Sequence, residues 1–344
     1  MKLIVTIPAF DEEATIADVI REVPRRIAGF DSVEVLVLDD GSRDETVEVA
    51  RQAGADHVVS QPMNRGLAAT FKLALGEALK RGADVIVNTD ADNHYDQTRI
   101  PELVRPIVDR EGDITIGSRL IDGLEMKRAN RYGNKAANFM LQRLLSIPDV
   151  DVSTGFRAYS REAALKLNVL SHHTYTHETL LNALDQRLRI VNVPLAARSV
   201  ARPSRLIKSI RSHVWRAGIV IVQSFLLYRP LQVYGLLGAL LVIAGCLPFA
   251  RFGYFAVAGN PAGHVQSLVI GVALWFMGGQ MLALGMLAHA IAWNRRMIEE
   301  VLYTQKQAAT APTEGQAVAK RLLRAVGTPE SEEMESVGAN GRAA

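Results

Sequence analysis

The chain has 344 residues, of which 49% are hydrophobic and 22% are charged, and its formal net charge is +3. The small net charge and the sparse aromatic residues exclude the basic, aromatic-rich surface of a nucleic-acid-binding protein. Because Cys246 is the single cysteine, the chain forms no intramolecular disulfide and no thiolate metal cluster. So many apolar residues beside so many charged ones predict a soluble part joined to a membrane part.

The N-terminal stretch MKLIVTIPAFDEE is predicted to be a buried strand that runs into a loop. Pro8 and the acidic residues after it interrupt the apolar run, so the stretch lacks the hydrophobic region of a secretory signal peptide. We therefore expect the N-terminal half of the chain to stay in the cytoplasm.

Strand-like and helix-like runs alternate over the N-terminal third of the chain. Strands are predicted at residues 2–8, 33–40, 57–60, 84–90 and 114–119, and helices at 12–27, 42–54, 66–82 and 99–110. Fully apolar strands that alternate with helices predict a mostly parallel sheet with helices on both faces, an α/β fold. In such sheets ligands bind beyond the carboxyl ends of the strands.

Acidic and other polar residues follow the predicted strands at that edge, at 8–12, 39–42, 90–94 and 117–119. Asp90 and Asp92 are one residue apart, and two carboxylates that close repel unless a cation lies between them. Hard cations prefer oxygen ligands and share them with substrate phosphates. The pattern favours a nucleotide diphosphate held with Mg²⁺ or Mn²⁺, and the alternative is an exposed Asx-turn.

Motifs in this part of the chain resemble, in their order, the family 2 glycosyltransferases of the GT-A fold. The resemblance is strongest to the branch of dolichyl-phosphate mannose synthases and polyprenyl-phosphate glycosyltransferases, and it covers about residues 3–210. The motifs are IPAFDEE, DDGSRDET, NRG, DADNH, GSR and TGFRAYSREA. The resemblance implies a Rossmann-like GT-A catalytic domain over residues 1–203, followed by membrane helices.

The resemblance also implies roles for individual residues. The nucleotide sugar is implied to contact Pro8, Ala9, Glu12, Asp39, Asp40, Gly66, Asp90, Ala91 and Asp92. The implied catalytic residues are Asp90, Asp92 and Arg119, of which Arg119 matches the family arginine that meets phosphate. The acceptor phosphate is implied to bind Arg131, Arg202, Ser204 and Lys208, and Glu178 matches an acidic position that suggests an acceptor-site role.

The implied metal is Mg²⁺ or Mn²⁺, with Asp90, Asp92 and His94 as ligands. His94 stands where the family often has a glutamine, and imidazole suits Mn²⁺ better than Mg²⁺. This departure leaves the choice of metal open. The family's GxSK acceptor motif is only approximated here by RPSRLIK, which begins at Arg202.

Residues 231–249 and 265–293 are apolar, contain no Asp, Glu, Lys or Arg, and are long enough to cross a bilayer as helices. We expect a transmembrane hairpin over residues 231–296 with both ends in the cytoplasm, because arginines flank its two ends. The basic, amphipathic residues 204–230 are expected to lie in the headgroup region, or alternatively to form the solvated face of a packed helix. Residues 297–344 are predicted to be a largely disordered cytoplasmic tail.

These expectations combine into one functional hypothesis: inverting, metal-dependent transfer of a single hexose to a lipid phosphate at the cytoplasmic membrane face. The hexose is mannose or glucose, the donor a GDP- or UDP-sugar, and the acceptor dolichyl or undecaprenyl phosphate. One alternative is a family 2 transferase with a different lipid acceptor. Another is a catalytically silent membrane scaffold. The sequence leaves a homo-oligomer open.

Overall fold

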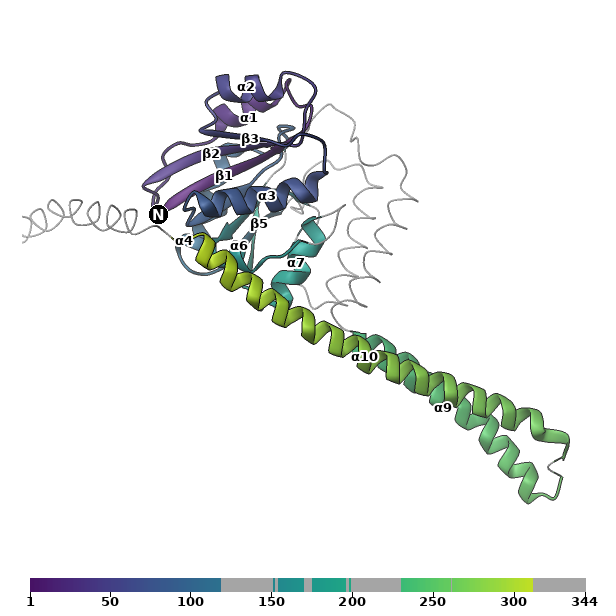
Figure 1. Ribbon diagram of the computed structural model, residues 1–344. Coiled ribbons are helices and arrows are strands. Elements are labelled where there is room, and N and C mark those ends of the chain that lie inside the picture. The colour runs from purple at the N-terminus through teal and green to yellow at the C-terminus, as the bar shows by residue number, and fades with distance from the viewer. Residues whose placement is uncertain are drawn as a thin grey trace, which may run out of the picture.

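The computed structural model describes residues 1–118, 151, 154–169, 175–195, 198, 230–260 and 262–311. An α/β domain is built from the N-terminal part, and a long helical hairpin projects away from it (Figure 1). Several residues with predicted roles lie outside the described residues: Arg119, Arg131, Arg202, Ser204 and Lys208. The same is true of residues 204–229 of the predicted interfacial segment and of residues 312–344.

Within the described part of the chain, one mixed sheet has the strand order β3-β2-β1-β4-β6-β5-β7. β6 is antiparallel to both of its neighbours, β4 and β5, whereas the other pairs are parallel. The prediction of a mostly parallel sheet is therefore confirmed. The strands are β1 (Lys2–Ala9), β2 (Ser32–Asp39), β3 (His57–Ser60), β4 (Val85–Asn88), β5 (Ile114–Ser118), β6 (Arg157–Ser160) and β7 (Ile190–Pro194).

Helices cover both faces of the sheet, as the sequence predicted (Figure 1). Side chains alternate between the faces along a strand, so Ile4 belongs to one hydrophobic core while Leu3 and Val5 belong to the other. The first core contains residues of α3 (Leu67–Lys80), α6 (Arg161–Lys166) and α7 (Tyr175–Asp185). The second contains residues of α1 (Ile16–Glu22), α2 (Thr46–Gln52) and α4 (Ile100–Val108), which follows the 3₁₀ turn η1 (Gln97–Arg99).

The strand register brings the polar strand ends together at one edge of the sheet. Ala9 pairs with Asp39 across β1 and β2, and Thr6 pairs with Asn88 across β1 and β4. β5 runs in the same direction as β4 because β6 is antiparallel to both. The carboxyl ends of β1, β2, β4 and β5 therefore lie at the same edge.

The hairpin consists of α9 (Pro230–Val257) and α10 (Val265–Ala309), joined through the short turn η2 (Ala262–His264). The two helices approach closely at glycines: a Cβ added to Gly238 would lie 2.9 Å from the carbonyl oxygen of Gly278. At 1.5 Å per residue, the 28 residues of α9 extend over about 42 Å, which exceeds the roughly 30 Å hydrocarbon core of a bilayer. Both helices are long and apolar enough to cross a membrane.

α10 continues past Arg296 to Ala309, so residues 297–309 are helical rather than part of a disordered tail. The expectation of disorder came from the polar composition of the tail as a whole, whereas residues 297–309 include Ile298, Val301, Leu302 and Tyr303. The segment is helical because it extends a long helix and because its side chains contact the α/β domain, as described below. The boundary predicted at residue 297 is thus displaced to the end of α10.

Candidate active site

Asp90, Ala91 and Asp92 form a turn directly after β4, at the edge where the strand ends meet. The partly buried carboxylate of Asp90 lies against Gly155, which precedes β6. A Cβ added to Gly155 would come within 2.7 Å of both carboxylate oxygens of Asp90. Only glycine therefore allows the carboxylate to take this position.

Hydrogen bonds hold the Gly155 peptide from two sides. Asn88 Nδ2 donates to the carbonyl oxygen of Gly155 at 3.0 Å and to the hydroxyl of Tyr175 at 3.1 Å. The Gly155 N–H donates to the hydroxyl of Tyr95 at 3.1 Å. Burial, and next the nearby charge of Asp90, raise the pKa of Tyr175 well above its usual value, so Tyr175 stays neutral. We call Asn88, Tyr95, Gly155 and Tyr175 the Asp90 support, because they hold the backbone against which the Asp90 carboxylate lies.

Asp92 is exposed, and its Oδ1 accepts a hydrogen bond from the backbone N–H of His94 at 3.1 Å. The Asx-turn considered as an alternative is thus present, with Asn93 at its corner in a left-handed conformation (φ 57°). An Asx-turn leaves further lone pairs of the carboxylate available. The turn and a ligand-binding role are therefore compatible.

The expected metal ligand set of Asp90, Asp92 and His94 is not assembled. Among the described residues, no three His, Cys, Asp or Glu side chains lie close enough to hold a metal ion. The His94 ring instead packs edge-on against Tyr95, with the ring centroids 5.5 Å apart. Mg²⁺ commonly uses one or two carboxylates together with substrate phosphates, so Asp90 and Asp92 fit such an ion without a third protein ligand.

Asp40 is buried and organises the loop that leads into α3. Its carboxylate accepts hydrogen bonds from the N–H groups of Arg65 (2.8 Å) and Gly66 (2.9 Å) and from Gln61 Nε2 (3.0 Å). Gly66 has a φ of +89°, which favours glycine, and α3 begins at the next residue. Asp39, also buried, accepts from the N–H of Ser42 at 2.9 Å.

The loop after β1 is tied to both neighbouring strand ends. The carbonyl oxygen of Ala9 accepts from the N–H of Asp40 at 2.9 Å, and the N–H of Glu12 donates to Thr46 Oγ1 at 2.9 Å. Thr15 Oγ1 donates to the carbonyl oxygen of Ala91 at 2.7 Å, which links this loop to the Asp90 turn. The structure therefore brings all of the predicted nucleotide-sugar residues to this edge of the sheet: Pro8, Ala9, Glu12, Asp39, Asp40, Gly66, Asp90, Ala91 and Asp92.

Arg198 is a member of this region that the sequence did not reveal. Its Nη1 donates to the Glu22 carboxylate and to Asn93 Oδ1, each at 2.8 Å, and its Nη2 lies 3.2 Å from Asp96. The hydrogen bond to Glu22 is the main reason that the pKa of Arg198 is raised. Arg198 therefore anchors the turn that carries Asp92. No motif marks it, because its partners are remote in the sequence.

Glu178 lies in the first turn of α7, close to the support beneath Asp90, because Tyr175 begins the same helix. The buried guanidinium of Arg157 holds this turn by donating to the carbonyl oxygen of Thr176 (2.8 Å) and to Thr179 Oγ1 (2.9 Å). Arg157 also went unnoticed in the sequence, although it stands within the TGFRAYSREA motif.

A family model described as Glycosyl transferase family 2 matches residues 4–167. A dolichyl-phosphate hexose transferase of Haloferax volcanii is 30% identical over 205 residues, which are 59% of this chain and 86% of that protein. The chain belongs to glycosyltransferase family 2. Its α/β domain has the GT-A fold, with two long apolar helices added at the C-terminal side.

Two further comparisons are with a second curated protein and with a solved structure. A polyprenol monophosphomannose synthase of Mycolicibacterium smegmatis is 28% identical to this family 2 chain, over 56% of this chain and 76% of that protein. A solved structure of glucosyl-3-phosphoglycerate synthase from Mycobacterium tuberculosis, in complex with Mn²⁺, UDP-glucose and phosphoglyceric acid, is 25% identical. It covers 64% of this chain and 79% of its own, with a TM-score of 0.49.

Proposed function

We propose that this family 2 glycosyltransferase moves one hexose, mannose or glucose, from a GDP- or UDP-sugar to dolichyl or undecaprenyl phosphate. The observation that carries the proposal is the combination of parts in one chain. An acidic turn at the carboxyl edge of the sheet suits a water-soluble nucleotide sugar, and two long apolar helices suit an enzyme whose acceptor stays in the bilayer. The names of the two curated relatives, a dolichyl-phosphate hexose transferase and a polyprenol monophosphomannose synthase, agree with this assignment.

The donor binds at the edge formed by the loops after β1, β2 and β4. Asp40 shapes the loop at Gly66, and Thr15 holds the Asp90 turn against the first loop. Asp90 and Asp92 would hold Mg²⁺ or Mn²⁺, which would neutralise the charge of the diphosphate. The support at Gly155 fixes the Asp90 carboxylate before the donor arrives, so no reorganisation is needed during the reaction.

The acceptor is its own nucleophile. A phosphate monoester has a second pKa of about 6, so it is mostly a dianion at neutral pH and needs no general base. One of its oxygens forms a bond to the anomeric carbon while the bond to the diphosphate breaks and its electron pair leaves with the diphosphate. Attack from the opposite face inverts the configuration. In this proposal Arg119 stabilises the leaving diphosphate, the acceptor phosphate binds Arg131, Arg202, Ser204 and Lys208, and Glu178 has an acceptor-site role.

The hairpin places this chemistry at the cytoplasmic face of the membrane. Arginines stand at both ends of the hairpin sequence, at Arg229, Arg295 and Arg296, whereas Arg251 lies in the last two turns of α9, near the connection to α10. Positive residues favour the cytoplasmic side, so both helices cross the bilayer and both chain ends stay in the cytoplasm. The donor is then supplied from the cytosol and the acceptor from the inner leaflet.

The test is transfer of a labelled sugar into organic-extractable lipid. Membranes that contain the full chain are incubated with a panel of nucleotide sugars, polyprenyl phosphate and either Mg²⁺ or Mn²⁺. We expect one donor to give a product that mild acid cleaves. Asp92→Asn should abolish the product, whereas the matched variant Asp18→Asn, an exposed aspartate of α1, should leave it unchanged.

The other outcomes decide between the alternatives. If the chain binds the donor and metal but no lipid product forms, the acceptor is a different lipid and the assignment to polyprenyl phosphate is wrong. If the folded chain binds neither nucleotide sugar nor metal, it is a catalytically silent scaffold.

A further inference from the structure

The cytoplasmic end of α10 lies along the α/β domain. We call residues 294–310 the α10 extension. Figure 1 shows it running beneath α6 and α7, beyond the part of α10 that pairs with α9. Its less exposed residues recur every three or four positions, at 295, 299, 303, 306 and 310, which is the spacing of one helix face. The extension therefore docks by a single face.

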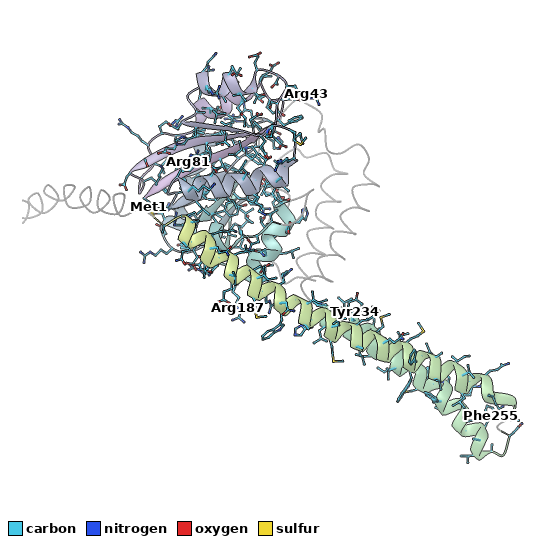
Figure 2. All side chains as sticks on the ribbon, in the orientation of Figure 1. Met1, Arg43, Arg81, Arg187, Tyr234 and Phe255 are labelled. Carbon is cyan, nitrogen blue, oxygen red and sulfur yellow. The ribbon has the colours of Figure 1, made fainter. Side chains whose placement is uncertain are left out.

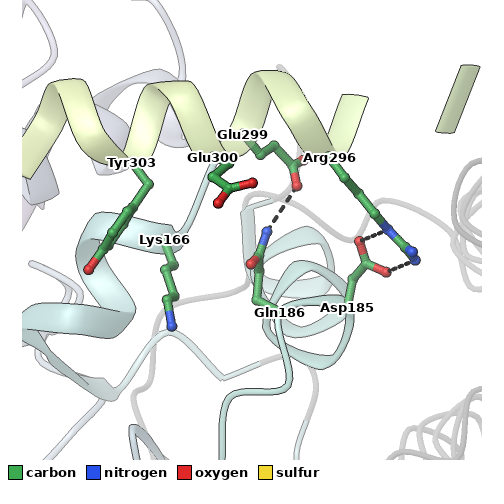
Figure 3. A pocket seen from close by; sticks show the side chains of 7 residues that line it. All are labelled: Lys166, Asp185, Gln186, Arg296, Glu299, Glu300 and Tyr303. Carbon is green, nitrogen blue, oxygen red and sulfur yellow. Dashed lines mark hydrogen bonds and ion pairs between the residues drawn. The ribbon is translucent and has the colours of Figure 1, made fainter. Parts of the chain in front are cut away.

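At the membrane-proximal end, the contacts join the extension to the end of α7. The carboxylate of Asp185 lies 2.6 Å from Arg296 Nη2 and 3.3 Å from Arg295 Nη2. Gln186 Nε2 donates to Glu299 at 3.0 Å, and the Glu299 side chain is 5% exposed (Figure 3). The pair of Asp185 with Arg295 is shielded on both sides and resists screening by salt better than an exposed pair, whereas Arg296 is half exposed.

At the C-terminal end of the extension, Lys306 caps the C-terminus of α6. Lys306 Nζ donates to the carbonyl oxygens of Leu165 (3.3 Å) and Leu167 (2.9 Å) and to Asn168 Oδ1 (2.8 Å). An ammonium group at the last carbonyls of a helix satisfies acceptors that have no partner within the helix. Arg161, at the start of α6, donates to the carbonyl oxygen of Thr310 at 2.6 Å.

Between these two ends, Tyr303 packs against the first hydrophobic core, and Lys166 lies 5.9 Å above its ring. A cavity of about 310 Å³, lined mostly by charged side chains that include Glu300, remains beside Tyr303 (Figure 3). The interface is thus held mainly by polar contacts with defined geometry. Such contacts fix the rotation of the helix about its axis, which a purely apolar contact would do less well.

α7 connects this interface directly to the candidate active site (Figure 1). Its first residue, Tyr175, accepts the hydrogen bond from Asn88 beneath the Asp90 support, and its last residue, Asp185, accepts the ion pairs of the extension. The 11 residues of α7 span about 16 Å. One short helix therefore separates the Asp90 support from the helix that leaves the membrane.

We propose that the α10 extension is a brace that fixes the height and orientation of the active site over the bilayer, with Asp185 as a positioning residue. This proposal rests on the proposed function, because it concerns how a membrane-bound acceptor meets the donor. α10 has no proline between Val265 and Ala309 and is one continuous helix. The α/β domain docked at its end is therefore held at a fixed distance from the bilayer. An acceptor phosphate is held at headgroup level and reaches the donor only if the site lies at the matching height. A soluble acceptor has no such restriction.

The test compares two acceptors with the full-length protein in lipid vesicles: a long-chain polyprenyl phosphate in the bilayer and a short-chain, water-soluble one. Two alanines inserted after Asn294 rotate the extension by about 200° and turn its docking face away. The same two residues inserted after Gly259, between the two hairpin helices, are the matched control. Asp185→Asn, with Asp185→Glu as the conservative rescue, tests the ion pair without an insertion.

Docking is measured independently of activity. Cysteines replace Gln186 and Glu299 in a Cys246→Ser background, and a short bifunctional maleimide joins them when the extension is docked. We expect the insertion after Asn294 to abolish this cross-link and to lower transfer to the bilayer acceptor by at least about tenfold. Transfer to the soluble acceptor should change by less than about twofold, because the chemical site is intact.

If no cross-link forms in the double-cysteine protein that lacks the insertion, the docked arrangement is wrong. Equal loss of transfer to both acceptors would show a structural role only, and no loss would show that the brace is not needed. If the parent protein transfers sugar to neither acceptor, the proposed function has failed and the positioning role falls with it, although a cross-link would still establish the docked helix.

Discussion

Gly155→Ala tests whether the position of the Asp90 carboxylate matters for catalysis. The added Cβ would lie 2.7 Å from both oxygens, whereas ordinary contacts begin at 3.4 Å, so the carboxylate must move by at least about 0.7 Å. The carboxylate is the end of a short side chain that can rotate, so the stability cost should be near the lower end for an overpacked site, about 1 kcal/mol.

The effect on activity should be larger than the effect on stability. Displacing a catalytic group by about 1 Å can cost about 100-fold in rate. A shift of this size at Asp90 should therefore lower kcat/KM by roughly 10- to 100-fold, or about 1.4–2.7 kcal/mol of transition-state stabilisation. The assay is the initial rate of lipid-linked sugar formation, with thermal unfolding followed by circular dichroism on the same preparation.

Gly76→Ala is the matched control. Gly76 lies within α3, and a Cβ there would have no neighbour within 4 Å, so this variant should keep its activity and gain about 0.5–1 kcal/mol in stability. If Gly155→Ala retains full activity at normal stability, the reasoning that links the support to catalysis is wrong. If the Gly155→Ala protein unfolds, the Asp90 carboxylate cannot move aside, and the overlap with the added Cβ destabilises the fold instead.

Asp40→Ala removes the acceptor of two loop N–H groups, so chemical denaturation should show a loss of about 1–3 kcal/mol; an unchanged midpoint would contradict this. Arg198→Met removes the hydrogen bond to Asn93, so the transfer rate should fall more than the thermal stability, and a parallel fall would mean that Arg198 serves only the fold. Burial, and then the charge of Lys72, lower the pKa of Lys306 from 10.5 to about 8. Between these values the docked state binds fewer protons than the undocked state, so docking should strengthen as the pH rises from 8 towards 10.5. The distance between spin labels on α7 and the α10 extension would report this, and Lys306→Met should remove the pH dependence.

Short-range sequence patterns were sufficient to predict the strands of the sheet and the polar residues at its carboxyl edge. Apolar runs identify the strands, and the residue after each run lies at a strand end, so Asp90 and Asp92 could be placed at the ligand-binding edge without a structure. The same patterns could not show that β6 is inserted antiparallel between β4 and β5. That insertion brings Gly155 beneath Asp90, and the pairing depends on the path of the chain rather than on local periodicity.

Residues that are remote in the sequence decided the remaining features. Arg198 reaches Glu22 across 176 positions, and an arginine among small and apolar neighbours carries no signal of such a partner. Residues 297–309 are predicted to belong to a disordered tail, yet they are helical, because Lys306 donates to carbonyl oxygens at the end of α6 and Glu299 accepts from Gln186 at the end of α7.

The sequence by itself determined the family, the α/β class and the position of the acidic edge, because these follow from residue order and from side-chain periodicity along single segments. Only the tertiary structure decided what supports the Asp90 carboxylate, what anchors the Asp92 turn and where α10 ends. Each of these depends on contacts between segments that fold together from distant parts of the chain, and such contacts leave no periodic trace in either segment.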